Sequence, residues 1–141
     1  MISLALPPLL NELIAAGRWP RTSAEAMRQN LAPLVSVARI QALAPEESAL
    51  YLEAPPFMTV RAVLADGSWW NDRTADPGNI DVDRTIIIGD FGMGTDAPIV
   101  LDYRLDAINP RVLRLRWSIG AQNRWVIMAP DFATFVAALG L

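Results

Sequence analysis

The sequence predicts an α+β protein: an antiparallel β-sheet flanked by N-terminal helices and one C-terminal helix. Three observations favour this class. Apolar residues recur at helical spacing near both ends of the chain, strand-like alternation begins at Thr85, and 141 residues with 52% hydrophobic content suffice for one buried core. Helices at both ends of a strand meander are typical of a sheet covered on one face. We therefore expect residues 1–141 to form a single domain.

Two helices are predicted before residue 35. The first covers residues 7–16, with proline in its first turn and Gly17 as its terminator. The second begins at Thr22, three residues before Glu25, which is the capping-box spacing, and ends or bends near Pro33.

The middle of the chain carries weaker signals. Prolines divide residues 36–56 and leave residues 49–52 as the one predicted strand there. Thr59 is expected to cap a short helix over residues 60–66 that stops at Gly67, and residues 76–79 are predicted to form a surface turn.

Four strands are predicted in the second half, over residues 85–88, 99–103, 113–117 and 125–128. Apolar residues alternate with Asp or Arg in the second and third of them, so we expect one wet face. A hairpin near residues 120–123 would connect the last two strands.

The clearest helix closes the chain. Pro130 is predicted in its first turn, apolar residues follow at i, i+3, i+4 and i+7 from Phe132, and Gly140 terminates it.

Several residue types that carry catalysis are absent. The chain has no cysteine and no histidine, and all 12 basic residues are arginine. Thiol nucleophiles, Cys/His zinc sites, Ser-His-Asp triads and Schiff-base lysines are therefore excluded. Carboxylates, hydroxyls and arginine remain and could still hydrolyse glycosides, so a weak carboxylate enzyme is the alternative. We expect a protein that is not an enzyme and that uses no cofactor.

No apolar stretch approaches the roughly 20 residues that cross a membrane, because charges, Pro or Gly interrupt each one. The first residues lack a basic region and run into Pro7, which argues against a signal peptide. A cytoplasmic location is the expectation.

Charge is unevenly distributed along this chain of net charge −3. Residues 81–106 hold six Asp against two Arg, a net −4, whereas residues 107–124 hold four Arg and no acid, a net +4. Paired as neighbouring strands, the two segments would form cross-strand ion pairs. The alternative is an acidic ridge beside a basic patch, in which Arg114 and Arg116 face a charged partner.

Residues 89–96 form a glycine-rich segment between two predicted strands. Its glycine spacing matches neither a dinucleotide fingerprint nor a P-loop. One interpretation is a tight connection that needs positive φ. The other is a rigid loop that presents Asp90 and Asp96 to a partner or, less readily, to a metal.

Trp69 and Trp70 are adjacent, so they cannot both point the same way in an extended chain. An exposed tryptophan beside charged residues is typical of an interface anchor or of a platform on which sugars stack. Nucleic acid is an unfavourable partner, because the net charge and the Asp-rich segment repel phosphates.

Three segments of the second half resemble the SUKH superfamily. They are residues 89–95 (GDFGMGT), 98–103 (PIVLDY) and 129–136 (APDFATFV), and the resemblance covers residues 85–141. That superfamily includes Smi/Knr-type regulators of fungal cell-wall synthesis and many bacterial immunity proteins.

The resemblance implies an α+β fold, no catalysis, and binding to another protein, typically a toxin that the immunity protein occludes. Gly92, Gly94 and Asp102 match the loop and strand pattern of the superfamily, and the match extends to the closing helix. These positions are mostly structural.

The favoured hypothesis is a cytoplasmic, non-enzymatic protein-binding domain, an immunity protein whose acidic loop meets a basic toxin domain. The surface residues proposed for it on physical grounds are Asp90, Asp96, Trp69, Trp70, Arg114 and Arg116. One alternative is a small-molecule or glycan-binding or regulatory module of the same fold. Another is a scaffold that pairs through a sheet edge, so the expected state is a monomer or a weak dimer.

Overall fold

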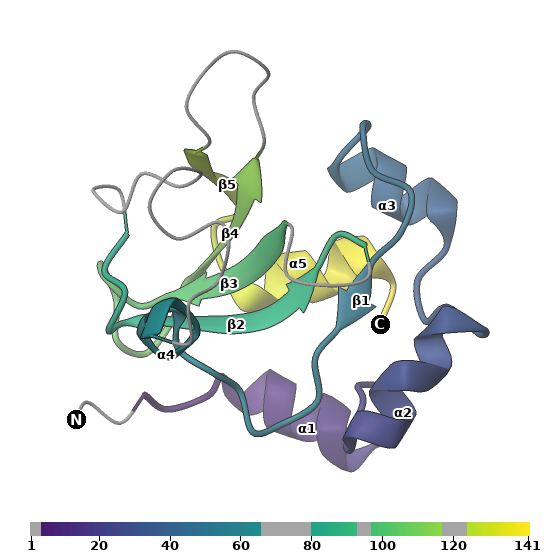
Figure 1. The fold of residues 1–141 in the computed structure, drawn as a ribbon, viewed down its shortest axis with the longest axis horizontal. Helices are drawn as coiled ribbons and strands as arrows, with labels where there is room; N and C mark the ends of the chain where they lie inside the picture. The colour runs from purple at the N-terminus through teal and green to yellow at the C-terminus, as the bar shows by residue number, and fades with distance from the viewer. Residues whose placement is uncertain (1–3, 66–79, 93–96, 117–123) are drawn as a thin grey trace.

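The computed structural model describes residues 4–65, 80–92, 97–116 and 124–141. The fold is α+β, as the sequence predicts, with helices flanking a five-stranded antiparallel sheet of order β1-β2-β3-β4-β5 (Figure 1). The elements in chain order are α1 (Pro8–Ala15), α2 (Ser23–Met27), the 3-10 helix η1 (Arg28–Asn30), α3 (Val37–Leu43), β1 (Tyr51–Leu52), α4 (Val60–Ala65), β2 (Thr85–Asp90), β3 (Pro98–Asp102), β4 (Arg111–Arg116), β5 (Arg124–Ala129) and α5 (Phe132–Leu139).

Side-chain caps begin α2 and α4, as predicted, whereas α1 begins after Pro7 without one. The Thr22 hydroxyl accepts a hydrogen bond from the Glu25 amide at 3.2 Å, and the Glu25 carboxylate accepts one from the Arg21 amide at 2.8 Å, one residue earlier than the capping box predicts. Thr59 likewise accepts from the Ala62 amide at the start of α4. The predicted stop at Gly67, the turn at 76–79 and the hairpin at 120–123 lie outside the described residues.

Two details differ from expectation. Helix α3 lies in residues 36–56, where only a strand was predicted; the Ser36 hydroxyl accepts from the Arg39 amide and begins it. Helix α5 begins after Asp131, whose carboxylate accepts from the Thr134 amide at 2.7 Å, so Pro130 precedes the cap and is not in the first turn. Gly140 ends α5 with φ of 77°, as predicted.

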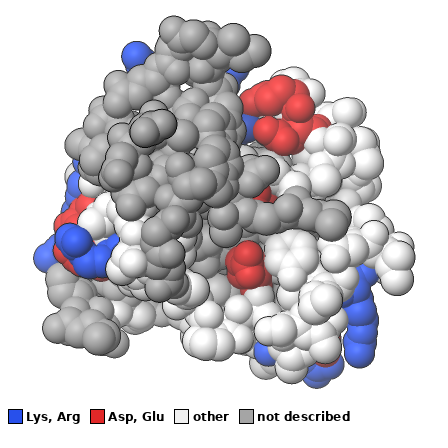
Figure 2. Space-filling view, viewed as in Figure 1, with Lys and Arg blue, Asp and Glu red and all other residues white. Residues whose placement is uncertain are grey.

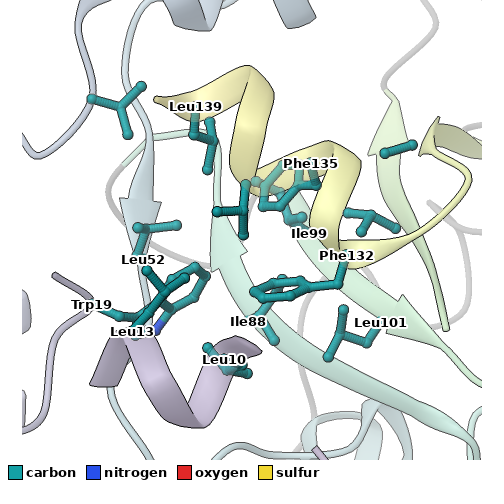
Figure 3. Close-up of a cluster of buried hydrophobic side chains, with 14 of the residues drawn as sticks. Leu10, Leu13, Trp19, Leu52, Ile88, Ile99, Leu101, Phe132, Phe135 and Leu139 are labelled. Atoms are coloured by element: carbon teal, nitrogen blue, oxygen red, sulfur yellow. The ribbon is translucent and has the colours of Figure 1, made fainter. Parts of the chain in front are cut away.

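One face of the sheet packs on helices from both ends of the chain. Figure 3 shows side chains of α1 and α5 meeting those of the central strands. Trp19 lies between them: its ring centroid is 5.9 Å from that of Phe132, and its indole N–H donates to the Glu53 carbonyl at 2.8 Å. This contact joins the N-terminal helices to the segment after β1.

The second face is also buried, which corrects the expectation of a wet face. Val60 of α4 and Ile80 pack with Val100 and Leu113 of the central strands in a separate apolar cluster. Two charged residues that suggested solvent exposure on β3 and β4 are Asp102, on this second face, and Arg114, on the first face beside Ile99; they are 1% and 6% exposed. They are buried because each has an ion-pair partner.

Phe135 of α5 is fully buried in the first cluster. We expect Phe135→Ala to lower the free energy of unfolding by about 3–5 kcal/mol, because lost apolar burial and the remaining cavity both cost free energy. Urea denaturation measures this change. Leu31→Ala, at a residue 94% exposed, is the control and should change it by less than about 0.5 kcal/mol. Equal effects of the two substitutions would contradict the packing described.

Candidate functional site

Three residues of the predicted surface and one predicted loop glycine cannot be placed. Trp69, Trp70, Gly94 and Asp96 lie outside the described residues. The predicted residues that the structure describes are Asp90, Gly92, Asp102, Arg114 and Arg116, and they occupy two different environments.

Asp90 ends β2 and is 2% exposed, so it does not present a carboxylate to a partner, contrary to the prediction. Its Oδ1 accepts a hydrogen bond from the Ala97 amide at 3.2 Å, and the Phe91 amide donates to the Ala97 carbonyl. The carboxylate therefore holds the two ends of the glycine-rich connection together. Gly92 has φ of 120°, in agreement with the predicted need for positive φ.

Asp102 is a structural residue at the end of β3. Its carboxylate accepts from the Arg111 guanidinium at 2.5 Å and from the Arg104 amide at 3.0 Å. Asp102 and Arg111 are direct partners in the β3–β4 register. This is the cross-strand ion pair that the opposite charges of the two segments indicated.

Arg114 of β4 is also buried and has partners from distant segments. Its guanidinium forms an ion pair with Glu46, lies 3.9 Å from the Glu47 carboxylate, and stands over the Phe91 ring at 5.4 Å from the centroid. Arg114 therefore connects the segment after α3 to the sheet and to the glycine-rich connection. Because Arg114 is buried, it does not present its charge to a partner, contrary to the prediction.

Among the predicted site residues that the structure describes, Arg116 is the exposed one. Its side chain is 58% exposed, and the nearest acidic group among the described residues is Glu46, at 3.8 Å. Across the β4–β5 ladder it stands directly opposite Arg124, which is exposed and has no ion pair within the described part of the chain. Two like charges at this spacing repel each other.

Arg114 and Arg116 line a groove of about 550 Å³ between the end of α3 and the edge of the sheet, and Arg124 stands next to Arg116. Figure 2 shows acidic side chains gathered at the upper right, over the end of α3 and the segment that follows it, with basic side chains beside them. The groove is lined by Leu43, Pro45, Glu46, Arg114, Arg116, Val126, Ile127 and Met128.

Sequence reasoning missed Glu46, which lines this groove, and the position of Arg124 next to the groove residue Arg116. Glu46 lies 68 residues before Arg114, in a segment where no helix was expected. Arg124 was counted in the basic segment, but only the strand register places it beside Arg116. A hairpin alignment of the last two predicted strands is the signal that could have found this second residue.

A smaller pocket of about 160 Å³ lies between η1, α3 and β1. Gln29 in its wall has a fully occupied amide: it donates to the carbonyls of Ala26 and Leu52 and accepts from the Leu52 amide. The volume is below the range of about 300–1,000 Å³ that is usual for ligand sites.

No group of three acidic residues in the described ranges is placed to hold a metal ion. Within those same ranges, no helix has the length and apolar character to cross a membrane. Comparisons of the chain with protein-family models, curated proteins and solved structures found no match.

The neighbouring acids Glu46 and Glu47 have opposite pKa shifts. The hydrogen bond from Arg114 holds the pKa of Glu46 below its ordinary value of 4.5, whereas burial raises that of Glu47 above it. The Glu46 charge therefore contributes stability above pH 4.5, which is lost as pH falls through the lowered pKa. The Glu47 charge lowers stability as pH rises from 4.5 through the raised pKa.

We expect Glu46→Gln to lower the free energy of unfolding at pH 7 and Glu47→Gln to raise it. Both differences should vanish once both carboxyl groups are protonated in the wild type. Urea denaturation from pH 3 to 7 measures the two curves. Because each variant is the control for the other, shifts of the same sign would contradict these assignments.

Proposed function

We propose that this chain is a non-enzymatic protein-binding domain and that the groove between α3 and the edge of the sheet is its binding surface. The observation that carries the proposal is the exposed pair Arg116 and Arg124 beside that groove. Exposed arginines are enriched where proteins bind one another, and a carboxylate can engage each guanidinium through two hydrogen bonds.

The finer proposal is an immunity protein that occludes a cognate toxin in the cytoplasm. Its support is the resemblance of residues 85–141 to the SUKH superfamily. An immunity protein needs a firm surface, and the groove is built on a sheet that is packed on both faces. The lack of Cys, His and Lys supports a role without catalysis.

We expect a partner of the opposite charge to the one in the sequence-based hypothesis. A basic toxin domain was expected to meet the acidic loop, but Asp90 is buried and its carboxylate is hydrogen-bonded within the fold. The carboxylate of the groove residue Glu46 already pairs with Arg114. The exposed arginines here are Arg116, which lines the groove, and its neighbour Arg124. An acidic segment of the partner fits them better than a basic one.

Affinity capture tests the proposal. Tagged wild-type protein should retain a partner from extracts of its native cells, and the double variant Arg116→Glu/Arg124→Glu should retain it about tenfold more weakly, because the charge complementarity is reversed. Arg18→Glu is the matched control, because Arg18 is exposed, follows α1 and is not among the residues that line the groove. Mass spectrometry identifies the partner.

Co-expression then tests the immunity role. The identified partner should arrest growth when produced alone, and the wild-type chain should restore growth better than the double variant. A partner that binds all three proteins equally would reject the groove. A partner that is harmless to cells would reject toxin neutralisation and leave the binding domain.

A further inference from the structure

Within the described part of the chain, the two edge strands of the sheet, β1 and β5, differ in whether their outward-facing backbone groups already have hydrogen-bond partners. At β1, the Gln29 side chain bonds both the amide and the carbonyl of Leu52, at 2.9 and 2.8 Å. It thereby occupies the backbone groups that an incoming strand would need. Protected edges of this kind prevent unwanted pairing.

The β5 edge has no equivalent cover among the described residues. Strand β5 pairs with β4 alone, and Ile127 at its centre is 61% exposed. The ladder is regular from Arg124 to Ile127 and shifts only beyond that point. Half of the backbone N–H and C=O groups of such an edge point outward, ready to pair with another chain.

The two faces of this edge have different chemistry. Arg124 and Val126 share a face with Arg116, because Arg124 is its direct cross-strand partner and side chains alternate along a strand. Ile127 lies on the opposite face, next to the apolar cluster that contains Leu113. An added strand would therefore meet positive charge on one side and apolar surface on the other.

The arginines at this edge are not equally available. Glu46 and Glu47 neutralise Arg114, which leaves Arg116 with a single contact at 3.8 Å and leaves Arg124 without an acid among the described residues. Carboxylates on an incoming strand would relieve the repulsion between these two groups.

We propose that an extended segment of the partner protein pairs with β5 as a sixth strand, with carboxylate side chains at alternate positions facing Arg116 and Arg124 and apolar side chains covering Ile127. This inference rests on the proposed function and names the chemistry of its partner. A nucleic acid is the weaker candidate, since it offers no strand backbone and the chain carries net charge −3.

Three labelled peptides test the pairing by fluorescence anisotropy at pH 7. The first is an alternating Glu-Val heptapeptide, the second has Lys in place of Glu, and the third is the first peptide with N-methyl groups on every second residue. The Glu-Val peptide should bind with a Kd below about 1 mM. The Lys-Val and N-methylated peptides should bind at least about tenfold more weakly, because one reverses the charge and the other blocks backbone pairing.

Protein variants complete the test. Arg116→Glu/Arg124→Glu should lose Glu-Val binding about tenfold or more, while Arg18→Glu keeps it. The added strand is rejected if the Glu-Val peptide does not bind, if the N-methylated peptide binds equally well, or if a single-stranded oligonucleotide of equal charge binds more tightly. Edge-to-edge dimers of the protein in sedimentation would also reject it.

Failure of this inference is distinguishable from failure of the proposed function. If the peptides fail but capture of the native partner still depends on Arg116 and Arg124, the groove binds a protein by some other geometry. If capture is also independent of them, both proposals are wrong.

Discussion

The buried guanidinium of Arg114 is the interaction on which the groove depends. Removing a charge from water is costly unless it is paired and hydrogen-bonded. Glu46 and Glu47 provide that pairing from the segment after α3, and the Phe91 ring lies against the same group. The segment must therefore lie against β4, and this places one wall of the groove beside the sheet edge.

Most helices and strands could be predicted from the sequence, but the burial of both faces of the sheet could not. Alternation and capping residues located the strands and α5, because these signals are local. Helix α3 was missed because its seven residues lie between Pro33 and Pro45 and give only one cap signal, at Ser36. The buried second face was missed because Asp102, which lies on it, looks solvent-exposed unless its partner Arg111 is known.

Charge counting located the right segments of the chain and misjudged which charges remain available. Of the four arginines in residues 107–124, Arg111 and Arg114 form ion pairs inside the fold. Arg116 and Arg124 remain exposed, and only the strand register shows that they are neighbours. A net segment charge cannot show which members are neutralised, because a partner such as Glu46 can lie 68 residues away.

A net charge of −3 and a basic groove act over different distances. Charges separated by more than about 8 Å are largely screened at physiological salt, so the net charge contributes little once a partner is in contact. Binding of the proposed partner would act at hydrogen-bond range, where guanidinium groups and strand backbone select the shape of a partner as well as the sign of its charge. Selection of the proposed partner at this edge would therefore depend on short-range contacts, which set the rate of dissociation, more than on long-range attraction, which sets the rate of association.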